Sequence, residues 1–235
     1  MGASELLGLL ARALAEADGD LPMPERMCQA CATVLGAESA ALTVAATADD
    51  RLTVATADGV AARVEDLEET LGEGPARLAL AEDRVVVREA DGSRDGGAFP
   101  VFSRVVGPIS GPATYHAVPM HAGGQVMGVL SLLTASTTLA RERGDVQFLA
   151  DLVGLSLLAD LESLDWSTRA EVHQATGMVT VQLRVTPRDA LAVLRAHAFA
   201  RSTTLEEVAE EVVGRRLSFV YDAGNTVRTQ RTEEP

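Results

Sequence analysis

Residues 171–183, EVHQATGMVTVQL, and the segments that follow them decide how the C-terminal part of this 235-residue chain folds. Apolar and small side chains recur there at helical spacing, and residues 190–199, ALAVLRAHAF, repeat the pattern. Small residues stand where neighbouring helices are expected to touch: Ala175, Gly177, Ala190 and Ala198. Helices this short are unstable alone in water, so we expect one three-helix bundle over residues 166–218.

Start signals divide this region into three helices. The first helix is expected over residues 168–183. Thr186 is suited to the N-cap of the second helix, because Pro187 follows at its first position and Asp189 at its third. Thr203, with Glu206 three residues later, predicts a capping box for the third helix. Residues 219–235 show no comparable pattern and are expected to form a disordered tail.

The N-terminal region, residues 1–160, mixes helical spacing with short β-branched runs. The predicted helices cover residues 4–17, 24–35, 61–71, 75–81, a short stretch near 99–106, and 141–164. The predicted strands cover residues 39–47, 51–56, 84–89, 114–120 and 126–134, with a flexible loop at 91–97. The strongest hairpin signal is Gly123-Gly124 between the last two strands. We therefore expect an α+β fold with an antiparallel sheet flanked by helices.

The helix at residues 141–164 carries apolar side chains on more than one side, among them Phe148, Leu152, Leu155 and Leu158. Such a helix must be buried on more than one side. One side can pack on the sheet, and a twofold copy of the chain is the simplest partner for another. This predicts a homodimer through residues 141–164.

The acidic excess is confined to the N-terminal region. Residues 1–165 hold 11 arginines against 25 acidic residues, whereas residues 166–235 hold nine of each. A neutral region with arginine clusters tolerates a polyanion better than the acidic region does, although acidic surface also serves solubility. No apolar run approaches the roughly 18–20 residues of a membrane span. The N-terminus lacks a basic leader, so we expect a cytoplasmic protein without membrane attachment.

Three pieces of the N-terminal region resemble a GAF domain: LGEGPARLAL at residues 71–80, FPVF at 99–102, and HAVPMHAGGQVMGVLSL at 116–132. The resemblance covers about residues 5–160 and implies a small-molecule sensor with an antiparallel sheet. Related regulators often have a cysteine where this chain has Ala76, so thiol sensing is not expected there. The pocket for an unknown small molecule or protein partner would be lined by Phe99, Phe102 and Tyr115.

Residues 166–218 resemble the ANTAR domain, a three-helix RNA-binding module of antitermination regulators. The resemblance rests on Arg169, on Ala175-x-Gly177-Met178, on Ala190, Leu194-Arg195 and Ala198, and on Val208-Ala209. GAF followed by ANTAR is a recurring arrangement in actinobacterial regulators. The resemblance implies binding of paired hairpin loops in nascent RNA, usually by a dimer, which prevents a terminator from forming. The residues expected to face the RNA are Arg169, His173, Gln174, Thr176, Gly177 and Arg195.

One departure from the family opens an alternative. Thr176 stands where a basic residue often contacts phosphate, so the chain could be a sensor and interaction module that has lost RNA binding. The small residues Ala175 and Gly177 would also be expected if they only allow close helix packing. Arg195 could be an ordinary solvated arginine, and His173 an ordinary surface histidine.

Nothing in the sequence requires catalysis, a metal or a cofactor. Cys28-Gln-Ala-Cys31 lacks the further ligands of a zinc site and lies in a predicted helix. We expect both cysteines in the core, although a cysteine-dependent reductase of the GAF type is a third hypothesis. His116 and His121 stand apart from other ligands, and Gly72-Glu73-Gly74-Pro75 reads as a turn, because it lacks the lysine of a phosphate loop.

Overall fold

A computed structural model describes residues 2–47, 50–90, 99–159, 167–222, 224 and 226–231. The chain divides into two compact units, whose main bodies are residues 1–68 with 73–164 and residues 165–235. We describe each unit by itself. The predicted loop at residues 91–97 and the end of the predicted long helix, residues 160–164, lie outside the described residues.

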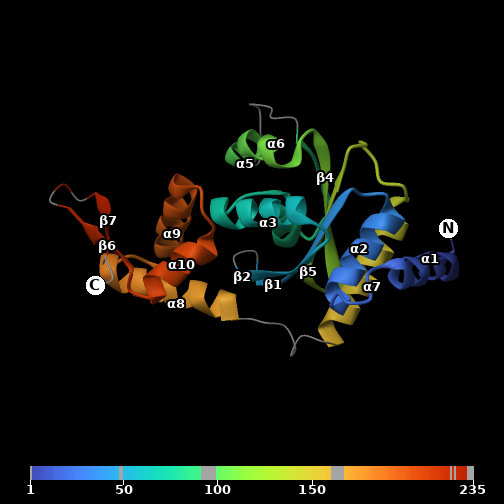
Figure 1. Cartoon of the computed structure of the whole chain (residues 1–235), viewed down its shortest axis with the longest axis horizontal. Helices are drawn as coiled ribbons and strands as arrows, with labels where there is room; N and C mark the ends of the chain where they lie inside the picture. The colour runs from blue at the N-terminus through green and yellow to red at the C-terminus, as the bar shows by residue number, and fades with distance from the viewer. Residues whose placement is uncertain are drawn as a thin grey trace. The chain divides into compact units, whose positions relative to one another are not determined.

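The first unit is built on a five-stranded antiparallel sheet with the strand order β2-β1-β5-β4-β3. The α+β prediction is therefore confirmed (Figure 1). The strands are β1 Ser39–Thr47, β2 Asp50–Thr56, β3 Val86–Ala90, β4 Ala113–Ala122 and β5 Gln125–Thr134. Gly123 and Gly124 join β4 to β5 with φ of +60° and +77°, the left-handed values that a two-residue hairpin turn requires.

Helices cover both faces of this sheet (Figure 1). On one face lie α1 Ala3–Glu16, α2 Met23–Leu35 and α7 Arg143–Ala159. On the other face lie α3 Gly59–Leu71, α4 Pro75–Glu82, α5 Pro100–Val105 and α6 Gly107–Ser110. Side chains alternate along β4, so Val118 and Met120 join the core under α2 and α7 while Tyr115 and Ala117 point to the opposite face.

The core under α1, α2 and α7 is aliphatic, since only 3% of the chain's residues are aromatic, and both cysteines belong to it. Cys28 and Cys31 lie in α2 and are fully buried. Burial raises the pKa of both thiols, that of Cys31 to about 12. A thiol with so high a pKa is almost entirely protonated at neutral pH, which suits a structural position in the core.

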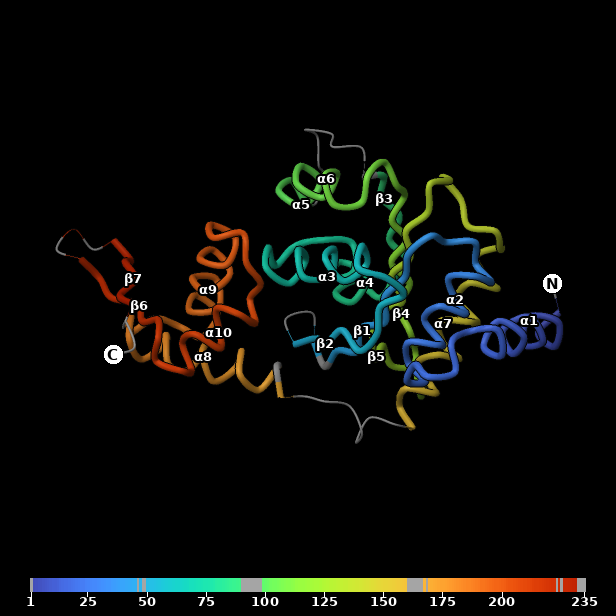
Figure 2. Tube along the Cα trace, in the orientation of Figure 1, coloured from blue at the N-terminus to red at the C-terminus, as the bar shows by residue number. Residues whose placement is uncertain are grey.

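The second unit holds α8 Ser167–Leu183, α9 Pro187–Arg201 and α10 Leu205–Val213, followed by strands β6 Leu217–Tyr221 and β7 Val227–Arg231 (Figure 2). The three predicted helices are confirmed in order, and the first spans Ser167–Leu183 against a predicted 168–183. Thr186 caps α9, since its hydroxyl accepts a hydrogen bond from the Asp189 amide at 3.2 Å. The capping box of α10 lies one residue later than predicted, between Thr204 and Glu207.

The prediction of a disordered tail is wrong for β6 and β7, which pair as an antiparallel hairpin. Leu217 and Phe219, two residues apart, point to one side of β6 and are buried in the core of the helices. The side-chain oxygen of Gln182 accepts a hydrogen bond from the Phe219 amide at 2.9 Å. The period of two was therefore present in the sequence, but the strand is too short to stand out.

The prediction that Gly177 stands at a helix contact is also wrong. Ala175, Ala190 and Ala198 are fully buried in the core of the second unit, as expected. Gly177 is exposed, and a Cβ atom placed on it would meet nothing within 4 Å. Packing therefore explains the three alanines and does not explain this glycine.

Candidate functional site

The predicted RNA-binding residues of α8 follow one side of that helix. Arg169, His173 and Gly177 are four residues apart and therefore form a line along it. Gln174 is rotated by about 100° from His173 around the helix axis. Arg195 comes from α9, directly after the buried Leu194.

These residues differ in how accessible they are. His173, Gln174 and Gly177 are exposed, Arg195 is half-buried and Arg169 is buried. Arg169, His173 and Arg195 already take part in polar interactions. An RNA contact from Arg169 would therefore require its guanidinium to leave its present partner, whereas Gln174 and Gly177 lie open on the outer side of α8.

The hydroxyl group of Thr176 is used within its own helix. It donates a hydrogen bond of 2.7 Å to the carbonyl of Val172, one turn earlier. Thr176 is half-buried. It supplies neither a charge nor a spare donor proton toward a phosphate group.

Three arginines that sequence reasoning did not select are exposed in the second unit: Arg184, Arg188 and Arg215. None of them has an acidic partner among the described residues. Arg184 and Arg188 flank the turn from α8 to α9. The signal that could have found them is the arginine on each side of the Thr186-Pro187 helix start.

Other arginines of this unit are paired with carboxylates. Arg201 donates two bonds to Glu211, at 2.6 and 3.0 Å, and Arg231 contacts the same carboxylate at 3.1 Å. Arg216 pairs with Glu210 at 2.9 Å. These pairs neutralise much of the positive charge away from the α8–α9 turn.

The predicted sensor residues Phe99, Phe102 and Tyr115 come together in the first unit. Their rings stack edge to face, with centroids 6.3 Å apart for Phe99–Phe102 and 5.8 Å apart for Phe102–Tyr115. All three are buried. They form a packed aromatic cluster on the α3–α5 face of the sheet rather than the open wall of a pocket.

A buried polar cluster lies beside Tyr115 on the same face. Arg51 Nη1 lies 3.4 Å from Glu68 Oε2 and 3.8 Å from Glu65 Oε2. Glu68 also accepts hydrogen bonds from the amides of Ala76 and Arg77, both at 3.2 Å. Burial raises the pKa of Glu68 to about 7 and that of the Tyr115 phenol well above its ordinary value.

The hydroxyl groups of Tyr115 and Ser131, on this face, have no hydrogen-bond partner among the described residues. Buried polar atoms are normally satisfied, by protein, water or ligand. This face therefore combines a packed aromatic cluster with two buried hydroxyl groups that lack a partner among the described residues.

The two histidines of β4 have different surroundings. His121 bonds Asp151 through Nδ1 and Asp83 through Nε2, both at 2.8 Å, and these pairings raise its pKa against the opposing effect of burial. His116 is buried, and burial lowers its pKa. The described residues include no group of three or more side chains suited to hold a metal ion.

Two family models match the chain. The GAF domain model matches residues 25–157, and the ANTAR domain model matches residues 165–213. The chain is a GAF and ANTAR domain-containing protein. No curated protein matches it closely enough to lend it a more specific identity. In this GAF and ANTAR domain-containing protein, the sheet and the helices within residues 25–157 are the GAF domain, and α8 to α10 are the ANTAR helices.

Solved structures similar to this protein are GAF domains and related sensors. The GAF domain of a phosphoenolpyruvate-protein phosphotransferase from Coxiella burnetii is 14% identical with a TM-score of 0.47, covering 69% of this chain and 98% of its own. The GAF domain of an Acinetobacter phosphoenolpyruvate-protein phosphotransferase is 14% identical with a TM-score of 0.45, covering 70% and 99%. A domain of a sensor histidine kinase protein from Sinorhizobium meliloti 1021 is 14% identical with a TM-score of 0.43, covering 61% and 93%.

GAF and ANTAR domains are sensory and regulatory modules, and ANTAR domains bind RNA. Signal-responsive regulation through RNA therefore fits this protein at the level of its domains. Among the described helices, none has the length and apolarity needed to cross a bilayer.

Proposed function

We propose that this protein is a cytoplasmic transcription antitermination regulator whose ANTAR domain binds hairpin loops in nascent RNA. The observation that carries the proposal is the ANTAR match over three helices that bury Ala175, Ala190 and Ala198 and leave the side of α8 around His173 and Gln174 exposed. Single-stranded loops are recognised through splayed bases and backbone phosphates. Imidazole and amide side chains can bond base edges, and Arg184 and Arg188, at the turn from α8 to α9, provide positive charge in the same domain.

The test is binding of the full chain to a panel of tandem RNA hairpins across a salt series. We expect His173→Ala/Gln174→Ala to weaken binding about 10-fold or more without changing its salt dependence, because these side chains would bond bases. Arg184→Gln/Arg188→Gln is expected to reduce the slope of log affinity against log salt by about 1.4, because each phosphate that an arginine neutralises contributes about 0.7 to that slope.

The matched control is Arg216→Gln/Arg228→Gln, which removes two exposed arginines that are paired with Glu210 and Asp222. This variant should keep wild-type affinity. Arg169→Ala/Arg195→Ala tests the residues that the sequence favours. If His173→Ala/Gln174→Ala and Arg169→Ala/Arg195→Ala both bind as tightly as the wild type, this face of α8 is not the RNA site.

A second candidate function is a sensor and interaction module that no longer binds RNA. It is favoured by Thr176, whose hydroxyl is already bonded to the Val172 carbonyl and carries no charge. Thr176→Lys separates the two functions. The second candidate is supported if the wild-type chain shows no detectable hairpin binding and Thr176→Lys binds at least about 10-fold above the detection limit. A lysine there would restore one phosphate contact.

We also propose that the protein is a homodimer through α7. Phe148, Leu155 and Leu158 lie on the side of α7 away from the sheet core and are 37%, 53% and 46% exposed. A second copy of α7 would cover them and remove apolar surface from water. Sedimentation of the full chain at micromolar concentration should give a dimer, and Leu155→Glu/Leu158→Glu should give a monomer.

The control for that experiment is Val181→Glu, which places one negative charge on an exposed valine of α8. It should leave the dimer intact. A wild-type chain that sediments as a monomer, or a dimer that survives Leu155→Glu/Leu158→Glu, would show that the α7 stripe is not the dimer interface.

A further inference from the structure

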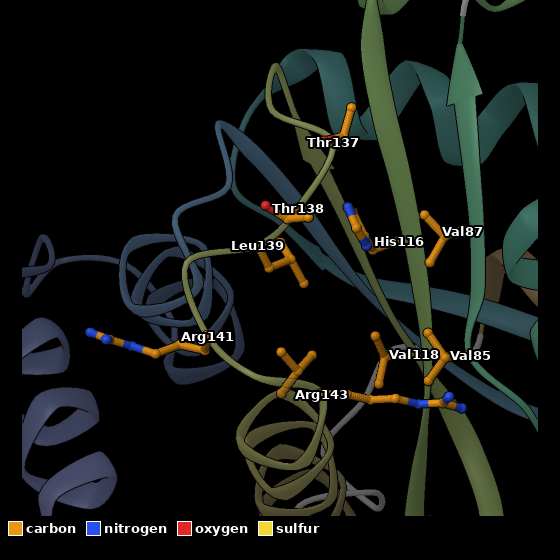
Figure 3. Close-up of a pocket in the computed structure, with 10 residues that line it drawn as sticks. Val85, Val87, His116, Val118, Thr137, Thr138, Leu139, Arg141 and Arg143 are labelled. Atoms are coloured by element: carbon orange, nitrogen blue, oxygen red, sulfur yellow. The ribbon is translucent and has the colours of Figure 1, made fainter. Parts of the chain in front are cut away.

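A pocket of about 310 Å³ opens on the α7 face of the first unit, on the opposite side of the sheet from the aromatic cluster (Figure 3). Its floor is formed by β4 and by the start of β3, and its wall by residues 137–143 and the first turn of α7. The pocket arises because α2 and α7 pack on β1, β2, β4 and β5 and leave the edge strand β3 uncovered. Val87 of β3 is 45% exposed there.

Most of the lining surface is apolar, with Val85, Val118, Leu139 and Val146 around a single buried polar ring. That ring is His116, which is 6% exposed and whose Nε2 atom has no hydrogen-bond partner among the described residues. In Figure 3 the imidazole lies among Thr138, Leu139 and Val87, at the edge of the aliphatic lining. A buried nitrogen without a partner is costly, and a ligand group that bonds it would remove that cost.

A cation stands at another edge of the same pocket. Arg143 is the first residue of α7, is exposed, and has no acidic partner in the part of the chain that the structure describes. Figure 3 shows its side chain running past Val118 toward Val85, whereas the side chain of Arg141 points away from the pocket. The N-terminus of α7 adds a favourable potential for an anion at this edge.

We propose that this pocket binds a small amphiphilic carboxylate, with its carboxylate on Arg143, its apolar body over Val118 and Val146, and a hydroxyl group on His116 Nε2. A dry apolar cavity of about 150 Å³ holds benzene, so about 310 Å³ suits a body of about 12 non-hydrogen atoms. A hydroxyaryl or hydroxyalkyl carboxylate of that size meets all three conditions.

This ligand would contact α7 directly, through Arg143 and Val146. The proposal rests on the proposed regulator only for signalling to RNA, because binding of the carboxylate itself does not depend on RNA recognition. Burial lowers the pKa of His116 and so keeps it neutral at neutral pH, which leaves its ring one donor and one acceptor for a hydroxyl group.

The test uses the full chain and 3-(4-hydroxyphenyl)propionate as the probe, with binding followed by amide NMR shifts. We expect saturable shifts confined to β3, β4, residues 137–142 and the start of α7, with a dissociation constant on the order of 1 mM or tighter, as ligands of this size reach. Two matched ligands, 3-phenylpropionate without the hydroxyl and 2-(4-hydroxyphenyl)ethanol without the carboxylate, should each bind about 3- to 10-fold more weakly.

Variants assign the two polar contacts. Arg143→Gln should abolish the preference for the carboxylate, and His116→Leu should abolish the preference for the hydroxyl group. Val87→Trp should fill the pocket and prevent binding, and because Val87 is partly exposed on an edge strand the variant should fold. Wild-type-like amide spectra outside the pocket verify that each variant is folded.

Absence of saturable shifts up to ~10 mM, ten times the expected constant, would overturn the proposal. Undiminished binding in Val87→Trp, or equal binding of all three ligands, would overturn it as well. Hairpin RNA affinity measured on the same proteins keeps the two proposals separate. Val87→Trp should lose the carboxylate and keep RNA, whereas failure of RNA binding in every protein would count against the regulator and leave the pocket standing.

Discussion

Gly74→Ala should destabilise the first unit severely, because two separate effects meet at that position. The backbone of Gly74 has φ of +153° and ψ of +172°, a region essentially restricted to glycine. A Cβ atom there would lie 2.3 to 2.6 Å from the side-chain atoms of Glu68. Glu68 is fully buried, so its carboxylate has nowhere open to move.

The size of the effect follows from these contacts. The backbone conformation costs about 1–3 kcal/mol for a residue other than glycine. Displacing the carboxylate breaks the bonds it accepts from the amides of Ala76 and Arg77 at the start of α4, each worth about 1.5 kcal/mol or more. Together these terms predict a loss of about 4–6 kcal/mol of unfolding free energy.

The matched control is Gly123→Ala. Gly123 has φ of +60°, and a Cβ atom on it would meet nothing within 4 Å, so only the backbone cost of about 1–2 kcal/mol applies. Hydrogen exchange of β4 and β5 peptides in the full chain reports the stability of this unit alone. We expect exchange of these peptides to be at least about 100-fold faster in Gly74→Ala than in Gly123→Ala, at about 1.4 kcal/mol for each factor of ten.

If the two variants differ by less than about 1 kcal/mol, the Glu68 carboxylate yields without cost and the reasoning is refuted. Glu68→Gln then serves as a second check. It keeps the shape of the side chain while removing its charge, so it separates the effect of the clash from that of the amide bonds.

Three further predictions concern single contacts. The folded pKa of Glu68, about 7, lies above its ordinary value of 4.5. The stability that Glu68 contributes is therefore complete below about pH 4.5 and is lost as the pH rises through 7. Relative to Glu68→Gln, the wild-type first unit should lose up to about 3 kcal/mol of unfolding free energy between pH 5 and 8, measured by unfolding at each pH. Thr204→Ala removes the capping box of α10 and should cost about 1 kcal/mol in thermal unfolding, whereas Thr203→Ala should cost less. Phe219→Ala should cost about 3–4 kcal/mol and speed hydrogen exchange in α8, and unchanged exchange would show that the hairpin does not stabilise the bundle.

Local rules predicted much of this fold. Gly123-Gly124 between two apolar runs gave the β4–β5 hairpin, because two consecutive left-handed residues leave few other turns. Thr186-Pro187 predicted the start of α9 for a similar reason. The Thr186 hydroxyl caps the helix, and the fixed φ of Pro187 suits its first position, so both effects lie within four residues of sequence. Where one short segment determines its own conformation, the sequence is sufficient.

Features that depend on distant partners were missed. Leu217 and Phe219 form a strand because the helices of the second unit offer a core to cover, and a five-residue segment does not reveal that core. Arg51 and Glu68 are distant in sequence and meet only inside the folded sheet. The pocket beside His116 likewise depends on where α7 stops covering the sheet. Such features need the tertiary arrangement.

The same contrast explains why the candidate RNA face was harder to predict than the helices that carry it. Val172, Ala175 and Val179 recur at helical spacing because each must fit the core, and that requirement produces a period. The residue types at exposed positions such as His173 and Gln174 are instead determined by what they bind, and binding does not require a periodic pattern in the sequence. Gly177 shows the same limit: its small size suits either a helix contact or an RNA contact, and its neighbours on that side of α8, His173, Gln174 and Val181, are exposed.

A physical route for signalling within the first unit follows from α7 alone. Val146, at the pocket, and Phe148, on the exposed stripe, lie on opposite sides of this helix, about 200° apart around its axis. A ligand shifts an equilibrium only by its differential affinity for two states, so it must bind one placement of α7 better than another. A helix moves as a rigid element. A displacement of α7 at Arg143 and Val146 would therefore also displace Phe148, Leu155 and Leu158. If the carboxylate probe binds but leaves the monomer–dimer equilibrium of the full chain unchanged, α7 does not couple the pocket to the dimer interface.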